Sequence, residues 1–126
     1  PGVLAMDKAM IEWADDPSVA LVLIEGAGEK AFCAGGDVRE LYRTGIAGDY
    51  SYSRGFWRDE YRLNARIQTY PKPYVAIMDG VTMGGGVGVS ALGSVRIVTD
   101  RALLAMPEAA IGLLPDAAAH GDAVHD

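Results

Sequence analysis

The chain has 126 residues, of which 50% are hydrophobic, so it is long enough for one domain with a substantial core. Its net charge of −6 and the lack of any basic run argue against nucleic acid as a partner, because Lys and Arg bind phosphate backbones. The single cysteine, Cys33, excludes an intramolecular disulfide and most structural zinc sites, and no apolar run is long enough to span a membrane.

The first third of the chain predicts a helix, a strand and a second helix. Apolar residues recur at helical spacing over residues 3–14, namely Val3, Met6, Met10 and Trp13. Residues 20–24 (ALVLI) form a continuous apolar run, which is typical of a strand buried on both faces. The glycine-rich segment 31–37 (AFCAGGD) then leads into a helix over 38–43, with Asp37 near its N-cap.

A long helix is predicted over residues 50–70, and one charged residue falls on its apolar face. Its apolar stripe consists of Phe56, Leu63 and Ile67, and Glu60 falls on the same face. One interpretation is a boundary position whose carboxylate reaches solvent, which general burial statistics favour. The other is a carboxylate that lines a cleft.

The stretch from residue 70 to residue 116 carries the strongest functional signal. An apolar run over 74–79 predicts a strand, glycines at 84–86 predict a turn, and a small-residue helix follows over 87–92. Residues 95–99 predict another strand and 102–105 a short extended segment. Strands that alternate with helices indicate an α/β fold. Two glycine turns at the ends of neighbouring strands can each donate one N–H to the same anionic oxygen.

Other chemistries have little support. Residues 86–91 fit the G-x-G-x-x-A dinucleotide pattern, but Glu108, the acidic residue at the expected distance, follows Met106-Pro107 instead of ending a strand. No serine lies in a G-x-S-x-G motif, and the two histidines lie in the polar C-terminal tail. Cys33 therefore lacks a histidine base, and a small residue in a tight turn is the simpler interpretation.

Two carboxylates, Glu108 and Asp116, each follow a proline in an otherwise apolar stretch (AMPEAAIGLLPD). Apolar surroundings raise the pKa of a carboxyl group and suit it to proton transfer or attack. The alternative, two exposed turn residues beside proline, is about equally compatible with the sequence.

Taken together, the motifs resemble those of the crotonase (enoyl-CoA hydratase/isomerase) superfamily. AFCAGGD at 31–37 and KPYVAIMDGVTMGGGVGVS at 72–90 are similar to its two oxyanion-hole segments. The resemblance implies a ClpP/crotonase-type ββα spiral over residues 1–116, incomplete at both ends, with 117–126 as an unaligned tail. It also implies that backbone N–H groups of Gly36 and Gly85 hold the thioester oxygen of an acyl-CoA.

Within the superfamily the chain most resembles the 3-hydroxyisobutyryl-CoA hydrolases. Enoyl-CoA hydratases carry a catalytic Glu where this chain has Gly88, whereas MPE…PD and WRDEYRLN are similar to hydrolase segments. The resemblance implies that Glu108 and Asp116 are catalytic, that Glu60 binds substrate and that the reaction belongs to valine breakdown. A hydratase or isomerase, or a truncated module that binds CoA esters without catalysis, are the alternatives.

The same resemblance sets the expected partners. Coenzyme A enters as part of the substrate, so no separate cofactor and no metal are expected, and neither is a nucleic acid or membrane partner. A homo-oligomer is a possibility for this family. The Arg-, Ala- and Gly-rich composition favours a bacterial, cytoplasmic protein, or a mitochondrial one if the source is eukaryotic.

Overall fold

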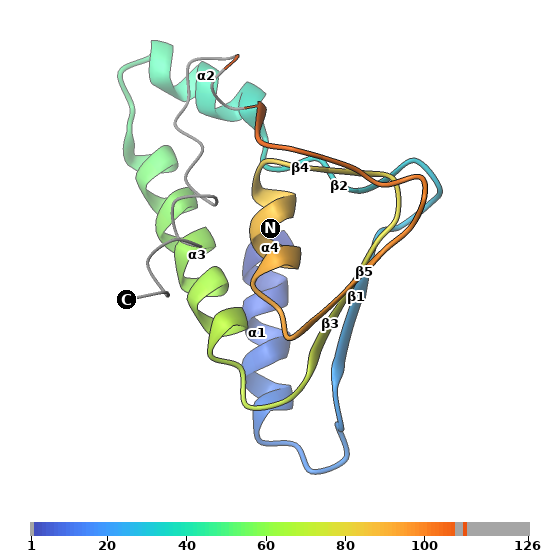
Figure 1. The fold of residues 1–126 in the computed structure, drawn as a ribbon. Coiled ribbons are helices and arrows are strands. Elements are labelled where there is room, and N and C mark those ends of the chain that lie inside the picture. The colour runs from blue at the N-terminus through green and yellow to red at the C-terminus, as the bar shows by residue number, and fades with distance from the viewer. Residues whose placement is uncertain (1, 108–109, 111–126) are drawn as a thin grey trace, which may run out of the picture.

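The structure is a computed structural model that describes residues 2–107 and 110. It contains two three-stranded parallel sheets with helices packed beside them (Figure 1). One sheet has the order β1-β3-β5, with β1 at Val22–Glu25, β3 at Tyr74–Met78 and β5 at Val95–Val98. The other has the order β2-β4-β6, with β2 at Ala31–Cys33, β4 at Val81–Met83 and β6 at Leu103–Ala105. This arrangement agrees with the predicted α/β class and with a ββα spiral.

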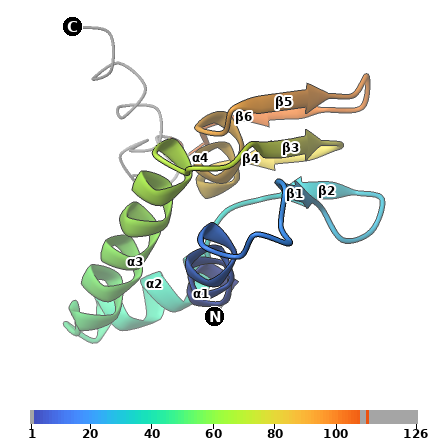
Figure 2. The same ribbon diagram turned by 90° about the horizontal axis from the view of Figure 1, so that it is seen from below.

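Over the described part of the chain, the polypeptide passes from the first sheet to the second three times, each time by a turn between consecutive strands. Figure 2 shows the three strand pairs β1–β2, β3–β4 and β5–β6 stacked on one another. The second turn centres on Gly80, which has φ +84° and lies so close to Lys30 that a Cβ there would approach the Lys30 carbonyl oxygen within 2.6 Å. Only glycine fits this corner without strain.

Hydrogen bonds of Asp79 and Arg101 connect the turns between consecutive strands. Asp79 accepts hydrogen bonds from the Thr99 hydroxyl at 2.6 Å and from the Arg101 guanidinium at 2.7 Å. Arg101 also donates to the carbonyl of Glu29, in the first corner, at 2.8 Å. The Arg101 and Thr99 hydrogen bonds lower the pKa of Asp79, so the carboxylate stays ionised in this position.

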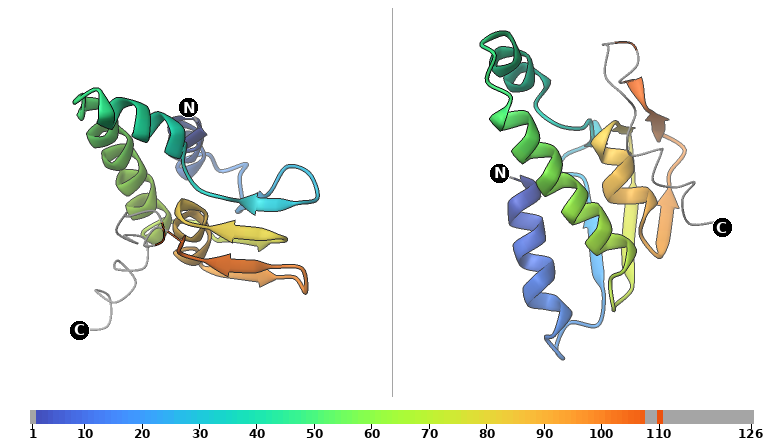
Figure 3. Two further views of the ribbon diagram at one scale, coloured as in Figure 1. Left: turned by 90° about the horizontal axis from the view of Figure 1, so that it is seen from above. Right: turned by 90° about the vertical axis from the view of Figure 1, so that its left-hand side faces the viewer.

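Within the described residues, four α-helices complete the fold. They are α1 (Gly2–Ala14), α2 (Val38–Ile46), α3 (Ser51–Gln68) and α4 (Gly85–Ala91). Helix α4 packs on β2, β3 and β4, and α3 packs on α4, α1 and α2 (Figure 3). Within residues 2–107 and 110, no helix is both long and apolar enough to cross a membrane.

The core lies between the sheets and helices α1, α3 and α4. Its buried apolar side chains are Met10, Val22, Phe32, Leu63, Ile67, Tyr74, Ala76, Met78 and Val89. Polar contacts also connect the helices around the core. Arg66 of α3 forms an ion pair with Asp7 of α1. The Tyr70 hydroxyl donates a hydrogen bond to the Met10 carbonyl at 2.7 Å. The long α3 therefore has a fixed position relative to both neighbouring helices.

The prediction that residues 20–24 form a strand buried on both faces was wrong. Val22 is buried, but Leu21 is 47% exposed and Leu23 is 51% exposed. Side chains alternate between the two faces of a strand, so only every second residue of β1 contacts the core. Strand β5 is exposed along its whole length, on both faces, and Leu103 and Leu104 of β6 are exposed as well.

Candidate active site

Two glycine segments lie side by side at the ends of two paired strands. Strands β2 and β4 are neighbours in the same parallel sheet. Gly84 follows β4 directly, and Gly35 and Gly36 follow β2 after one alanine. Gly35 has φ +104°, and a Cβ on it would lie 3.3 Å from the backbone nitrogen of Gly85. A Cβ on Gly86 would lie 2.3 Å from the Cys33 carbonyl oxygen. The absence of side chains is what allows the two backbone segments to touch.

Helix α4 begins at this contact. Gly84, with φ +56°, precedes the helix and donates its N–H to the Ala105 carbonyl at 3.1 Å. Val87, in the first turn, donates to the Gly84 carbonyl at 2.9 Å. The first N–H groups of an α-helix have no acceptor within the helix, so the region of Gly85 is suited to an electronegative ligand atom.

Helix α3 places one side chain against each of the two predicted hole glycines. The ring tip of Phe56 packs on Gly36, where a Cβ would lie 2.4 Å from Phe56 Cζ. One turn later, Glu60 packs on Gly85, where a Cβ would lie 2.5 Å from Glu60 Oε1. Residues four apart on a helix lie on the same face, which explains why Phe56 and Glu60 reach adjacent segments. The Phe56 ring also stacks on Tyr52, with ring centroids 6.3 Å apart.

Glu60 is largely removed from water, since the residue is only 8% exposed. The interpretation of Glu60 as a boundary residue that reaches solvent was therefore wrong. The cleft interpretation agrees with the structure: Glu60 lines a cavity of about 670 Å³ together with Gly36 and Gly85.

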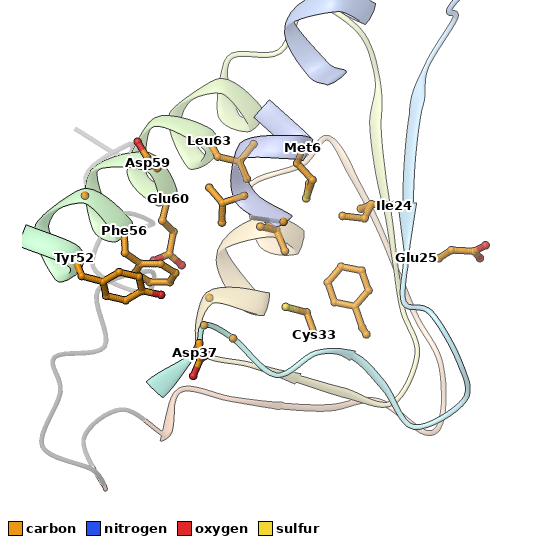
Figure 4. A pocket seen from close by; sticks show the side chains of 18 of the residues that line it. Met6, Ile24, Glu25, Cys33, Asp37, Tyr52, Phe56, Asp59, Glu60 and Leu63 are labelled. Carbon is orange, nitrogen blue, oxygen red and sulfur yellow. The ribbon is translucent and has the colours of Figure 1, made fainter. Parts of the chain in front are cut away.

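The cavity has a polar end and an apolar end. Figure 4 shows Phe56 and Glu60 at one end, while Met6, Ile24, Cys33 and Leu63 point into the remaining space. Phe32 and Val89 also line it. Ligand pockets in proteins are mostly apolar with a few placed polar groups, and their volumes are on the order of 300–1,000 Å³. This cavity has the size and composition of such a pocket.

The structure therefore brings together three of the five predicted site residues: Gly36, Gly85 and Glu60. Whether the two glycine N–H groups point at one atom stays a prediction. The other two, Glu108 and Asp116, lie outside the described residues, and so does the predicted tail at 117–126.

The sequence interpretation did not single out Asn64, which belongs to the same face of α3. Asn64 is only 4% exposed, and its carboxamide packs on Gly88, where a Cβ would lie 2.9 Å from Asn64 Nδ2. Its spacing of four residues from Glu60 was the signal that could have identified it. Glu60 and Asn64 thus face α4 at successive turns, each opposite a glycine.

The chain is similar to known proteins over most of its length. Residues 2–120 match the family described as enoyl-CoA hydratase/isomerase. Among curated relatives, the mitochondrial 3-hydroxyisobutyryl-CoA hydrolase of Gallus gallus is 56% identical over 104 residues, which are 82% of this chain and 27% of the relative. The Homo sapiens protein of the same name is 50% identical over 105 residues, 83% of this chain and 27% of the relative. The chain thus spans about a quarter of the length of these relatives.

Solved structures of proteins with other names have the same fold. An enoyl-CoA hydratase from Rhodobacter sphaeroides has a TM-score of 0.88 at 50% identity, over 91% of this chain and 34% of that one. A carnitinyl-CoA dehydratase from Mycobacterium thermoresistibile has the same TM-score and coverage at 56% identity. The predicted crotonase fold is confirmed by these similarities. The names of the curated relatives agree with the mitochondrial alternative for location, and nothing in the comparisons supports the cytoplasmic one.

Proposed function

This chain belongs to the enoyl-CoA hydratase/isomerase family, and from that premise we propose that it carries the acyl-CoA hydrolase site of the 3-hydroxyisobutyryl-CoA hydrolase type. The observation that carries the proposal is the meeting of Gly85, the Gly35-Gly36 segment and the buried Glu60 carboxylate at one end of a ligand-sized cavity. The curated hydrolase relatives, at 50–56% identity, support this choice of reaction.

The first step of the proposed reaction is electrostatic. The N–H groups of Gly36 and Gly85 receive the thioester oxygen and stabilise the negative charge that develops on it when the carbonyl is attacked. Removal of one such donor typically costs about two to three orders of magnitude in rate. Because both donors belong to the backbone, their positions depend on the glycine contacts described above.

The carboxylates then perform the chemistry. Glu108 either attacks the thioester carbon, which gives a mixed anhydride that water opens, or removes a proton from an attacking water. Both routes release free coenzyme A and 3-hydroxyisobutyrate, a step of valine breakdown. Asp116 orients the substrate hydroxyl or shares the proton transfer, and Glu60 binds the substrate. Coenzyme A is part of the substrate, so the reaction requires no further cofactor.

A hydratase or isomerase is the second candidate, favoured by the names of the solved structures. The arrangement at Gly88 speaks against it. The hydratase motif has a glutamate at this position, whereas here Gly88 has no side chain and the Asn64 carboxamide packs against it. A glutamate at position 88 would have to displace Asn64.

One experiment distinguishes the candidates. The protein is incubated with 3-hydroxyisobutyryl-CoA and, separately, with crotonyl-CoA, and release of free thiol is compared with loss of the enoyl absorbance. Thiol release from the first substrate that Glu108→Gln abolishes, with binding retained, supports the hydrolase. Loss of enoyl absorbance without thiol release would assign the hydratase reaction instead. Binding of both esters without turnover would indicate a non-catalytic module.

A further inference from the structure

The segment that contains Gly36 is positioned by its contacts with α4 and α3. Residues 34–37, between β2 and α2, are exposed and belong to neither a helix nor a strand. A Cβ on Gly35 would lie 3.3 Å from the backbone nitrogen of Gly85, at the start of α4. The next residue, Gly36, lies against the ring tip of Phe56 from α3. One aromatic side chain therefore limits how far the segment can move toward α3.

The Phe56 ring is itself held firmly. Leu63 and Ile67, on the same face of α3, are 0% and 2% exposed, so the helix is anchored in the core. The ring also stacks on that of Tyr52, with centroids 6.3 Å apart and an interplanar angle of 18°. A side chain on a closely packed helix has little freedom to yield. The ring is thus a rigid support for Gly36.

Helix α3 also relates the two glycine segments to each other. Phe56 packs on Gly36, and Glu60, four residues later, packs on Gly85. Four residues along an α-helix span about 6 Å. Two N–H groups that donate to one oxygen at the usual N···O distance of about 2.9 Å have their nitrogens at most about 5.8 Å apart. The spacing of the two contacts along α3 therefore suits a pair of donors that share one oxygen.

From this arrangement we infer that Phe56 is a positioning residue of the thioester reaction, whose ring holds the Gly36 N–H where it and the Gly85 N–H donate to the same oxygen. The inference rests on the proposed function, because it takes these two groups as the donors. Phe56 has no proton to transfer and no charge, so it acts through Gly36. Its loss should affect the transition state more than substrate binding, because the charge on the oxygen is largest there.

The contact atom gives the sharpest test. A Cβ on Gly36 would lie 2.4 Å from Phe56 Cζ, and Cζ is the atom on which a tyrosine carries its hydroxyl. Phe56→Tyr keeps the ring but adds an oxygen directed at Gly36, which should push the segment away. Phe56→Met removes the ring but leaves a flexible apolar chain that can fill the space. Phe56→Tyr should therefore be the more harmful change, whereas a ring that only stacked on Tyr52 would give the reverse order.

Release of free thiol from 3-hydroxyisobutyryl-CoA measures kcat and KM for each variant. Phe56→Tyr should lower kcat about 100-fold, as a misplacement of about 1 Å near a reacting centre can do, with KM changed less than about threefold. Phe56→Met should lower kcat by about tenfold or less. An unchanged kcat in Phe56→Tyr, or a larger loss in Phe56→Met, would overturn the inference.

Ile67→Val is the matched control for a loss of packing. It loosens the buried face of the same helix, eleven residues from Phe56, and should leave kcat unchanged. Phe56→Leu, which removes the ring tip without adding an atom, replaces Phe56→Tyr if that variant does not fold, and it should also lower kcat with KM little changed. A loss of kcat in Ile67→Val equal to that in the Phe56 variant would show a general effect of stability and overturn the inference.

A spectroscopic readout separates this inference from the proposed function. Two strong hydrogen bonds to the thioester oxygen lower the infrared stretching frequency of its carbonyl, which is measured with an isotope-labelled ester bound to Glu108→Gln protein. Phe56→Tyr or Phe56→Leu should reduce the frequency shift, and Ile67→Val should not. If the shift depends on Phe56 and no thioester is hydrolysed, the positioning role stands and the hydrolase assignment fails. If thioesters are hydrolysed but the shift is absent or independent of Phe56, the hydrolase assignment stands and the positioning role fails.

Discussion

The ring tip of Phe56 packs directly against Gly36, so closely that a methyl group at position 36 would lie 2.4 Å from Cζ of the ring. Position 36 therefore excludes a side chain for a reason of packing, since Gly36 does not have a positive φ. The aromatic residue belongs to α3 and the glycine to the segment after β2. A shift of α3 would therefore also shift the segment that contains Gly36.

The first prediction concerns this contact. Gly36→Ala should lower the free energy of unfolding by about 1–3 kcal/mol, because the ring or the loop must move to admit the methyl group. In a Phe56→Leu background the same substitution should cost markedly less. Urea denaturation of the four proteins, analysed as a double-mutant cycle, measures the difference.

Gly45→Ala is the control for the first prediction. Gly45 lies within α2, and a Cβ there would contact nothing within 4 Å. Alanine should stabilise the helix at this position by about 0.5–1 kcal/mol. If Gly36→Ala were as harmless as Gly45→Ala, the close packing of Phe56 on Gly36 would be wrong.

The second prediction concerns Gly85 and Glu60. Gly85→Ala should push the Glu60 carboxylate aside, because the methyl carbon would lie 2.5 Å from Oε1. Small displacements of groups around a reacting centre can cost about 100-fold in rate, and we expect a loss of that order in thioester turnover.

A double variant separates the packing effect from the functional one. Glu60→Ala in the Gly85→Ala background should recover stability, since the clash is gone, but it should not recover turnover. Thermal unfolding and thiol release are measured on the same preparations. Recovery of turnover in the double variant would show that Glu60 has no part in the reaction.

Most elements could be predicted because their patterns are long or carry caps. Helix α3 had an apolar stripe, and α2 had Asp37 as its N-cap, which accepts the Glu40 N–H. The strands β2 and β4 were missed. Each has three residues, too few for a period of two to be visible, and each lies next to glycines that indicated only a turn.

Site residues could be predicted from the sequence only where a residue type was unusual for its position or where one residue type was concentrated in a short segment. Glu60 stood out as a charge on an apolar stripe, and the glycine segments stood out by composition. The contacts of Phe56 with Gly36 and of Asn64 with Gly88 join segments far apart in the chain. They depend on how α3 packs on its neighbours, which no local pattern determines.

The third prediction concerns Asn64. Its Oδ1 is buried and accepts no hydrogen bond within the described part of the chain. A buried acceptor without a donor costs about 1–3 kcal/mol, so Asn64→Leu should be neutral or stabilising if the leucine fits beside Gly88. Asn64→Asp should be strongly destabilising, because it buries a charge.

Thermal denaturation of both Asn64 variants checks this prediction. Gly88→Ala is the complementary change: it should destabilise the protein when Asn64 is present and do so less when residue 64 is alanine. A large loss of stability in Asn64→Leu would instead show that Oδ1 has a partner, for example a buried water.

The last prediction concerns pH and Tyr74. Its side chain is fully buried, its hydroxyl donates to the Val89 carbonyl at 2.7 Å, and burial raises its pKa. In the unfolded chain a tyrosine loses its proton near pH 10, whereas the folded protein keeps the proton to higher pH. The contribution to stability is therefore fully present below about pH 10 and decreases as the pH rises from there toward the folded pKa, by about 1.4 kcal/mol per pH unit. Tyr74→Phe should cost about 1 kcal/mol at neutral pH, since the Val89 carbonyl loses its donor, and should remove most of this alkaline slope.

Tyr70, whose pKa is also raised by burial, leaves a smaller residual slope. Urea unfolding between pH 8 and about pH 11 measures the slope, and Tyr42→Phe, at a residue that is 70% exposed, is the control. Equal slopes in the Tyr74→Phe and Tyr42→Phe proteins would show that the Tyr74 hydroxyl is not held protonated by the fold.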